Sequence, residues 1–226
     1  MDIQSNRSRC MVLFFFVILF FTMMMSRPGV AEVGVVVGDF VAGELEDWKE
    51  EVFSGKTLYE LVDSADGSTL KADSKASASG LFREITIDLK KTPCLVWSWK
   101  VDGILEGLDE TTKGGDDYPA RIYVIFSGGL FFWNTRALNY VWSSNQPMDS
   151  VWPNAFTDRS VMIAVNSRKT KVGQWVQHSR NIREDYNRLI GEDVTTVDAV
   201  AIMTDTDNSE REVTAYYGNV RFTPSC

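Results

Sequence analysis

Two adjacent carboxylates and an arginine precede an apolar strand in the segment 114–126, GGDDYPARIYVIF. Asp116 and Asp117 stand next to Arg121, and the apolar positions of the strand then alternate, at Ile122, Val124 and Phe126. Charged side chains that a long loop brings to a sheet are typical of a ligand site. The alternative is structural, an ion pair between Asp117 and Arg121 that stabilises the loop.

Alternation along the strand predicts that Arg121 and Tyr123 point away from the core. Lys100 does the same on the candidate strand 94–101, so the three side chains share one open face if the two strands pair. Asp117 could orient the Arg121 guanidinium through a charge-assisted pair, while Asp116 points to the other side. Two basic groups in an acidic chain favour an acidic glycan over a neutral one.

A second oxygen-rich run lies at 203–209, MTDTDNS. Asp205, Asp207 and Asn208 could hold Ca²⁺, Asp205 could contact a ligand, or the run could be an ordinary turn. Two carboxylates at a suitable separation can also act as acid and base on a glycosidic bond, which makes Asp117 and Asp205 a candidate catalytic pair.

Other catalytic and cofactor motifs are absent from the sequence. His178 is the single histidine, and it lacks a GxSxG nucleophile motif or an HExxH zinc motif beside it. We expect it to be a half-exposed strand residue. No dinucleotide or phosphate loop occurs, so the sequence predicts no cofactor, apart from the calcium alternative.

The first 31 residues resemble an export signal. Two arginines precede the apolar run 11–25, and Gly29 and Ala31 suit cleavage before Glu32. Cleavage leaves 20 of 23 basic and 30 of 31 acidic residues, a net charge of −10. We expect a periplasmic or secreted protein that does not bind nucleic acid and meets the membrane only through an uncleaved signal.

Two cysteines, Cys94 and Cys226, remain after cleavage. In an oxidising compartment they could form a disulfide between a strand start and the chain terminus. The alternative is a buried free Cys94 beside a frayed C-terminus.

Period-2 patterns dominate residues 32–226, which we expect to form a single domain. The candidate strands are 51–62, 69–77, 81–89, 94–101, 120–127, 137–143, 160–166, 174–180, 196–204 and 213–222. Together they predict an all-β fold, a two-sheet antiparallel sandwich of jelly-roll type. One helix is expected at 183–190, with Asn181 as its cap and Gly191 as its stop. Uniform parity places Trp97 and Trp99 in the core.

Several runs resemble a bacterial family, Domain of Unknown Function 3047. The matching runs are 97–101 (WSWKV), 114–124, 137–142 (ALNYVW), 152–154 (WPN), 180–186 (RNIREDY), 201–208 (AIMTDTDN) and 217–222 (YGNVRF). The closing run 216–222 is also similar to the last strand of galactose-binding-like and other carbohydrate-binding jelly rolls. The resemblance implies a fold and its extent, without a mechanism.

Three functions therefore remain open. The first is an exported, non-catalytic binding domain for a glycan or other polar small ligand, over Lys100, Arg121 and Tyr123. The second is a structural or assembly partner in a bacterial cell-envelope complex. The third is a carboxylate-based enzyme that acts on polysaccharide.

Overall fold

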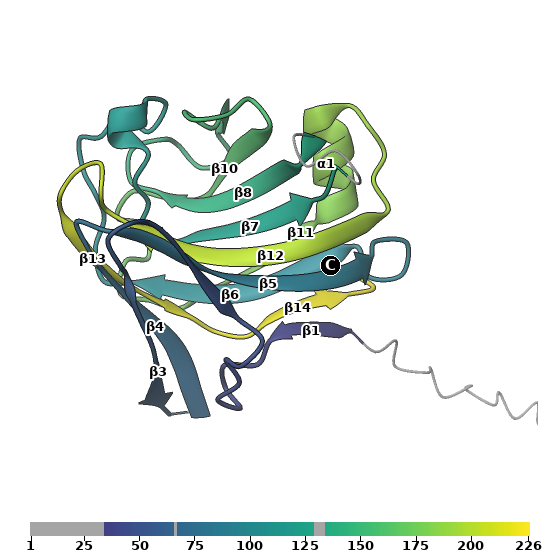
Figure 1. Cartoon of the computed structure of the whole chain (residues 1–226), viewed down its shortest axis with the longest axis horizontal. Helices are drawn as coiled ribbons and strands as arrows, with labels where there is room; N and C mark the ends of the chain where they lie inside the picture. The colour runs from purple at the N-terminus through teal and green to yellow at the C-terminus, as the bar shows by residue number, and fades with distance from the viewer. Residues whose placement is uncertain (1–33, 66, 129–133) are drawn as a thin grey trace, which may run out of the picture. The chain divides into compact units, whose positions relative to one another are not determined.

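Two β-sheets packed face to face make up most of the protein (Figure 1). The structure is a computed structural model that describes residues 34–65, 67–128 and 134–226. The export signal expected at 1–31 lies outside these residues. Within the described part, no helix combines the length and the apolar character needed to cross a lipid bilayer.

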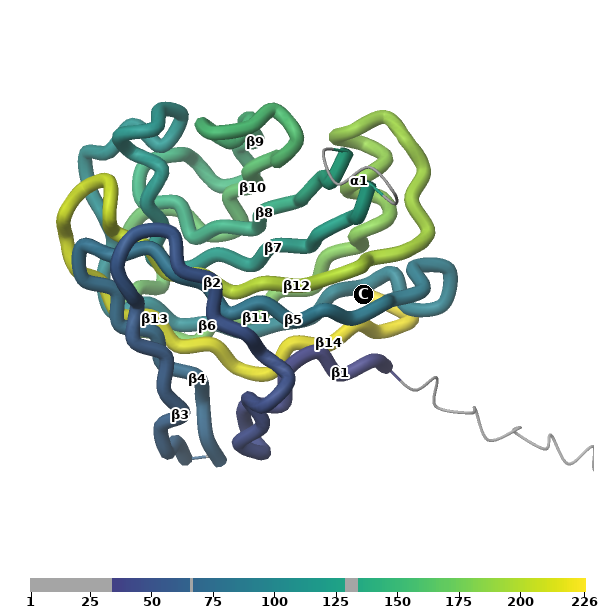
Figure 2. The backbone as a smooth tube through the Cα atoms, viewed as in Figure 1, coloured from purple at the N-terminus to yellow at the C-terminus, as the bar shows by residue number. Residues whose placement is uncertain are grey.

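Sheet 1 contains the first and last strands of the described chain. Its order is β1 (Val35–Gly38), β14 (Val220–Thr223), β6 (Cys94–Val101), β13 (Glu212–Tyr217), β4 (Gly67–Lys75) and β3 (Leu58–Ser64), and β11 (Val176–Asn181) also pairs with β6. In Figure 2 the last strand, β14, runs beside β1, as their antiparallel register requires.

Sheet 2 forms the other layer. Its order is β2 (Lys49–Ser54), β5 (Ala78–Asp88), β12 (Thr196–Asp205), β7 (Arg121–Phe126), β8 (Arg136–Ser143), β10 (Ser160–Ser167) and β9 (Val151–Pro153). One pair, β8 with β10, is parallel and every other pair in the described sheets is antiparallel. The predicted two-sheet sandwich of jelly-roll type is therefore confirmed, with one parallel pair that the sequence did not predict.

The core lies between the sheets and is rich in aromatic residues. Trp97 and Trp99 of β6 are 1% and 0% exposed, which confirms the parity argument. Trp97 packs on Tyr140 of sheet 2 with ring centroids 5.4 Å apart, and Trp99 faces Trp142 at 6.4 Å. Truncating one of these buried rings would remove a large apolar area and leave a cavity between the sheets.

The helix agrees with its sequence signals. α1 spans Ile182–Ile190, and the Asn181 side chain accepts a hydrogen bond from the Glu184 N–H at 3.2 Å. Gly191 adopts a left-handed φ of 83° and its N–H donates to the Asn187 carbonyl, which ends the helix. A short 3₁₀ turn, η1 (Lys113–Gly115), is a second helical element, in the loop before β7.

Two candidate strands each divide into two. The run 51–62 becomes β2 and β3, which belong to different sheets, because the chain turns at Gly55 with φ of 62°. The run 213–222 becomes β13 and β14, which pair with different parts of β6 on either side of Gly218 and Asn219. The sequence prediction missed both breaks, although the phase of the buried positions changes in the second run, from Val213, Ala215 and Tyr217 to Val220 and Phe222.

A disulfide joins Cys94, at the start of β6, to Cys226 near the end of the chain. Their Cα atoms are 5.4 Å apart, and 132 residues separate them in sequence. The disulfide is thus the correct one of the two alternatives that the sequence left open. It fixes the C-terminal residues beside the buried centre of sheet 1.

Candidate functional site

The candidate site lies on the outer face of sheet 2, the face turned away from the core. Arg121 opens β7 there and is 2% exposed. The loop 102–120 covers it, and a small second core of Tyr118, Val141, Trp152, Met162 and Ala164 packs between that loop and the sheet. Arg121 leaves the main core as predicted, but it is buried under a loop rather than open to solvent.

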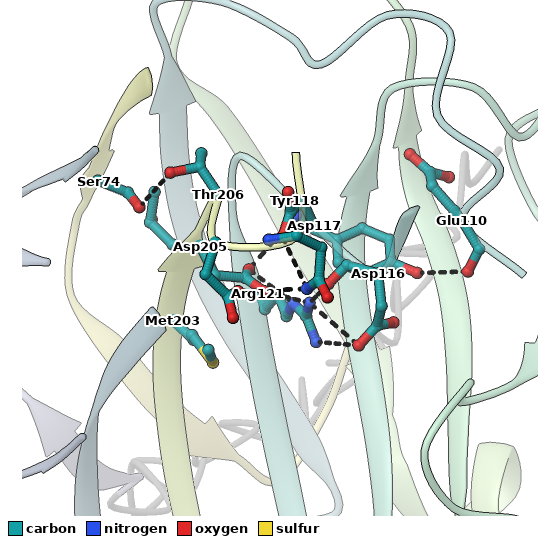
Figure 3. A network of polar contacts seen from close by, with 12 residues as sticks. Ser74, Glu110, Asp116, Asp117, Tyr118, Arg121, Met203, Asp205 and Thr206 are labelled. Carbon is teal, nitrogen blue, oxygen red and sulfur yellow. Dashed lines mark hydrogen bonds and ion pairs between the residues drawn. The ribbon is translucent and has the colours of Figure 1, made fainter. Parts of the chain in front are cut away.

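Two carboxylates and two aromatic rings surround the Arg121 guanidinium, and Figure 3 shows Asp116, Asp205 and Tyr118 among them. Asp205 accepts from Nε at 3.0 Å and from Nη2 at 2.5 Å, and Asp116 Oδ2 lies 3.4 Å from Nη1 and Nη2. The Tyr118 ring centroid is 4.2 Å from the guanidinium carbon, and Nη1 donates to the Tyr123 hydroxyl at 2.8 Å. The guanidinium is therefore held in one orientation by fixed partners.

Burial affects the ionisation of these groups. It raises the pKa of Asp205, against the opposing effect of Arg121, and the nearby Asp117 adds to the rise. Burial also raises the pKa of Tyr123 to about 12, so this phenol stays neutral at physiological pH. The tyrosine can donate its own proton while it accepts from Arg121.

Asp117 does not pair with Arg121, contrary to the sequence prediction. Its carboxylate accepts from the Asn208 N–H at 3.2 Å, the Asn208 side-chain amide at 3.1 Å and the Ser209 N–H at 2.6 Å. β7 begins only at Arg121, so strand alternation does not extend back to residue 117. Asp117 instead fixes the turn after β12, and Asp116 takes the place next to Arg121.

Lys100 does not share a face with Arg121. β6 belongs to sheet 1 and β7 to sheet 2, so the two side chains leave opposite faces of the sandwich. The Lys100 ammonium lies 3.8 Å from Asp102 Oδ1 and 3.8 Å from the Tyr216 ring centroid. With Lys100 elsewhere and Arg121 already paired with two carboxylates, the argument for an acidic glycan loses its basis.

Three carboxylates come together beside Arg121. Oxygens of Asp117, Asp205 and Asp207 all lie within 4.8 Å of one another. Asn208, which the sequence placed in a metal set with Asp205 and Asp207, donates its amide to Asp117 and Asp207 instead. Burial and the neighbouring Asp117 raise the pKa of Asp207, and within the described ranges this carboxylate makes no ion pair.

A cleft of about 440 Å³ opens over these charges. Asp116, Arg121, Asp205 and Asp207 form its polar end, and Asn154 donates from its side-chain amide to Asp116 at 3.2 Å. Two exposed aromatic side chains, Phe53 and Phe156, also line it, with 67% and 57% of their surfaces exposed. Asn154, Phe53 and Phe156 were not predicted as site residues, because each belongs to an edge strand or loop that only the fold brings to Arg121.

An apolar groove of about 350 Å³ adjoins this cleft on the same sheet face. The two share Phe53, Tyr123 and Met203, and the other lining residues of the groove are Glu51, Gly80, Phe82, Ile125, Ala201 and Ile202. Phe82, Ala201 and Tyr123 are direct cross-strand neighbours on β5, β12 and β7. Apolar residues at the outward positions of three strands were visible in the sequence and could have indicated this groove.

A buried glutamate holds the covering loop in place. Glu110 is 0% exposed, accepts from the Ser144 N–H at 2.7 Å and also from the Ser143 hydroxyl. Its backbone carbonyl accepts from the Tyr118 hydroxyl at 3.1 Å. Burial raises the pKa of Glu110. The residue thus positions the loop that covers Arg121, and its place in the sequence gave no sign of this role.

His178 is half-buried at an edge of sheet 1, outside the candidate site. Its ring lies 5.0 Å from that of Trp97, and Nε2 is 2.6 Å from the Asn166 side-chain oxygen. Burial lowers the pKa of His178 to about 4, and Lys171 and Arg180 add to this effect. The packing agrees with the expected strand residue.

The chain belongs to the family described as Protein of unknown function (DUF3047), whose model matches residues 46–221. The family resemblance inferred from the sequence runs is therefore confirmed. No curated protein matches the chain.

Solved structures with a similar fold include several carbohydrate-binding modules. The family 11 module of the cellulosomal cellulase Lic26A-Cel5E of Clostridium thermocellum is 11% identical, with 85% of this chain and 95% of that chain covered and a TM-score of 0.46. The family 30 module of Cel9D-Cel44B of the same organism is 9% identical, with 85% and 94% covered and a TM-score of 0.46. The Emp47p carbohydrate recognition domain is 10% identical, with 86% and 96% covered and a TM-score of 0.45. At these scores the likenesses do not indicate what this chain binds.

Proposed function

We propose that this protein is an exported, non-catalytic domain that binds a glycan across the outer face of sheet 2. The proposal rests on one observation, the continuity of a charged cleft and an apolar groove through the shared residues Phe53, Tyr123 and Met203. A ligand that spans both must be apolar on one face and rich in hydrogen-bonding groups along its edges.

A pyranose ring meets this description. Its C–H faces pack on aromatic and aliphatic side chains, as on Phe53 and Phe82, and its hydroxyls are donors to carboxylates. Asp116 and Asp207 line the cleft, and Arg121 and Asn154 orient Asp116 before any ligand arrives. Such fixed acceptors reduce the entropy lost on binding.

The same geometry weighs against the carboxylate enzyme. Asp117 and Asp205, the pair considered as acid and base, are 0% and 2% exposed. Amide groups of Asn208 and Ser209, in the turn after β12, donate to Asp117, and Arg121 donates to Asp205. A general acid or base must reach the reacting oxygen, and the hydrogen bonds of these two carboxylates are directed toward the protein.

Binding to a glycan array, followed by calorimetry on the strongest hit, tests the proposal. Ala201→Phe would fill the groove between Phe82 and Tyr123 without entering the core, and we expect it to abolish binding while the melting temperature is unchanged. Trp175→Ala is the matched control, because this 48% exposed tryptophan lies beside Gly218 of sheet 1. If Trp175→Ala loses binding and Ala201→Phe does not, the site lies on sheet 1 and the proposed site on sheet 2 is wrong.

Calcium belongs to the same experiment. The three clustered carboxylates make Ca²⁺ a candidate co-ligand, so binding is measured with added Ca²⁺ and with EDTA. An affinity that EDTA does not change would remove calcium from the proposal. No binding to any glycan in either condition would contradict the proposed function and favour a structural role in the cell envelope.

Export is tested separately. The apolar run 11–25 and the small residues Gly29 and Ala31 support cleavage before Glu32. N-terminal sequencing of the protein from its native host should therefore begin at Glu32. A protein that begins at Met1 and stays in the membrane fraction would show an uncleaved anchor instead.

A further inference from the structure

The polar end of the cleft has more negative charge than its one basic residue can neutralise. Four carboxylates, those of Asp116, Asp117, Asp205 and Asp207, lie around the single guanidinium of Arg121. This is a formal excess of three negative charges in a partly buried place. Like charges brought together in a medium of low polarity are costly, and a bound cation or a proton lowers that cost.

The four carboxylates have different partners. Asp116 and Asp205 make ion pairs with Arg121, and backbone and side-chain amides hold Asp117. Asp207, like Asp117, has no basic partner within the described residues, but it is partly exposed at the cleft wall, and the Asn208 side-chain amide donates to it at 3.2 Å. It is the carboxylate that a ligand can reach and pair with.

Aromatic rings at the mouth of the same cleft add to the attraction for a cation. Phe53 and Phe156 are both more than half exposed, and the negative face of such a ring attracts an ammonium group. The chain places one of its own cations here, because Lys113 Nζ lies 5.3 Å from the Phe156 ring centroid. Lys113 is exposed and at the rim, so a ligand ammonium can compete with it.

A buried amide below the cleft also lacks a partner. Asn139 is 0% exposed on β8, directly across from Tyr123, and its amide nitrogen donates to Ser160, a residue of the cleft lining. The Asn139 side-chain oxygen has no hydrogen-bond partner in the described structure. One buried acceptor next to the cleft lining is thus left without a partner in the described structure.

From these observations we infer that the cleft recognises a positively charged sugar, a glycan unit with a free, protonated amine, and pairs that amine with Asp207. The inference rests on the proposed glycan binding and specifies the ligand class for it. An N-acetylated unit has the same ring and no charge, and it would forgo the ion pair with Asp207.

Two matched oligosaccharides test the inference, the β-1,4-linked glucosamine tetramer and its N-acetylated counterpart. Titrations are made from mildly acidic to neutral pH, because the free amines must be protonated while Asp207, whose pKa is raised, stays ionised. We expect the free amine form to bind about tenfold more tightly, and added salt to reduce that difference. Equal or tighter binding of the N-acetylated tetramer would overturn the inference and leave glycan binding intact. Binding of another, neutral glycan with no binding of either tetramer would overturn it in the same way.

Three variants then test whether Asp207 is the carboxylate that pairs with the ligand amine. Asp207→Asn should lower the affinity for the glucosamine tetramer about tenfold and the affinity for the N-acetylated tetramer by less. Lys113→Gln should raise it severalfold, because a competing cation is removed from the rim. Asp63→Asn, on sheet 1, removes the same charge far from the cleft and should change nothing. An Asp207→Asn variant that binds like the wild type would exclude this site, and its melting temperature shows that it is folded.

Discussion

Outward-pointing charged side chains differ in burial between the two outer faces of the sandwich. On sheet 1, Lys100 keeps a quarter of its side chain exposed and sits near Asp102 and Tyr216. On sheet 2, Arg121 keeps 3% exposed, and a loop, two carboxylates and two tyrosines enclose it. Both residues occupy equivalent outward positions on their strands, so strand parity cannot distinguish them.

What separates the faces is the length of the connections that cross them. The loop 102–120 and the segment around Trp152 fold back over sheet 2 and build a second small core there. Burial of its charges is then possible only because acceptors are supplied from β12 and from the loop itself. Charges held buried in fixed positions beside a cleft make the outer face of sheet 2 the candidate ligand site.

The largest effect expected from this comparison is on folding stability at Arg121. Arg121→Ala leaves Asp116 and Asp205 buried without a basic partner, which should cost about 3–5 kcal/mol in the free energy of unfolding. Urea denaturation monitored by tryptophan fluorescence measures it. A loss below about 1 kcal/mol would mean that the enclosure around Arg121 is open in solution and that the two faces do not differ as described.

A buried histidine without an acidic partner should make stability depend on pH, whereas a solvated histidine should not. The pKa of His178 is lowered to about 4 by burial, while the unfolded chain has an ordinary value near 6.5. The unfolded state thus binds a proton first, and stability falls as the pH drops through this window, by about 2–3 kcal/mol in all. His178→Gln keeps a donor for Asn166, and its unfolding free energy should lose that part of the slope between pH 6.5 and 4. An identical slope in both proteins would show that the histidine is solvated.

The link between the two sheets is the next test. The Tyr217 hydroxyl, from sheet 1, donates to the Met203 carbonyl at 2.8 Å and lies 3.3 Å from the Arg121 N–H. Tyr217→Phe removes these contacts to β12 and β7, together with one to the Thr204 hydroxyl at 2.9 Å, and should cost about 1–2 kcal/mol. If the free energy of glycan binding falls by more than the free energy of unfolding, the hydroxyl positions the cleft residues as well as stabilising the fold. A neutral variant would mean that the sheets are aligned by apolar packing alone.

The smallest effect should occur at Lys100. Its ion pair with Asp102 spans 3.8 Å at the surface, and such pairs contribute about 0–1 kcal/mol. Lys100→Ala should accordingly unfold near the wild-type midpoint and retain the glycan affinity of the wild type. Lost affinity with unchanged stability would contradict the assignment of the site to sheet 2 and favour a site that includes Lys100 on sheet 1.

Local sequence signals determined the elements and their faces. Alternation placed Trp97 and Trp99 in the core, and Asn181 and Gly191 marked the ends of α1. These signals depend on backbone geometry over a few residues, in which period and capping are fixed by sterics and by hydrogen bonds within one segment. The family resemblance likewise rested on runs that could be compared without a structure.

Only the tertiary structure decided which elements meet. It gave Arg121 its partner Asp205, 84 residues away, moved Lys100 to the other sheet, and joined Cys94 to Cys226. Alternation along a strand predicts that a side chain points away from the core. It does not predict which strands pair, or which loop covers that side chain. Those contacts depend on the order of strands in each sheet, which alternation within a strand does not encode. The cleft and its excess of negative charge are therefore properties of the fold, assembled from residues that are far apart in the chain.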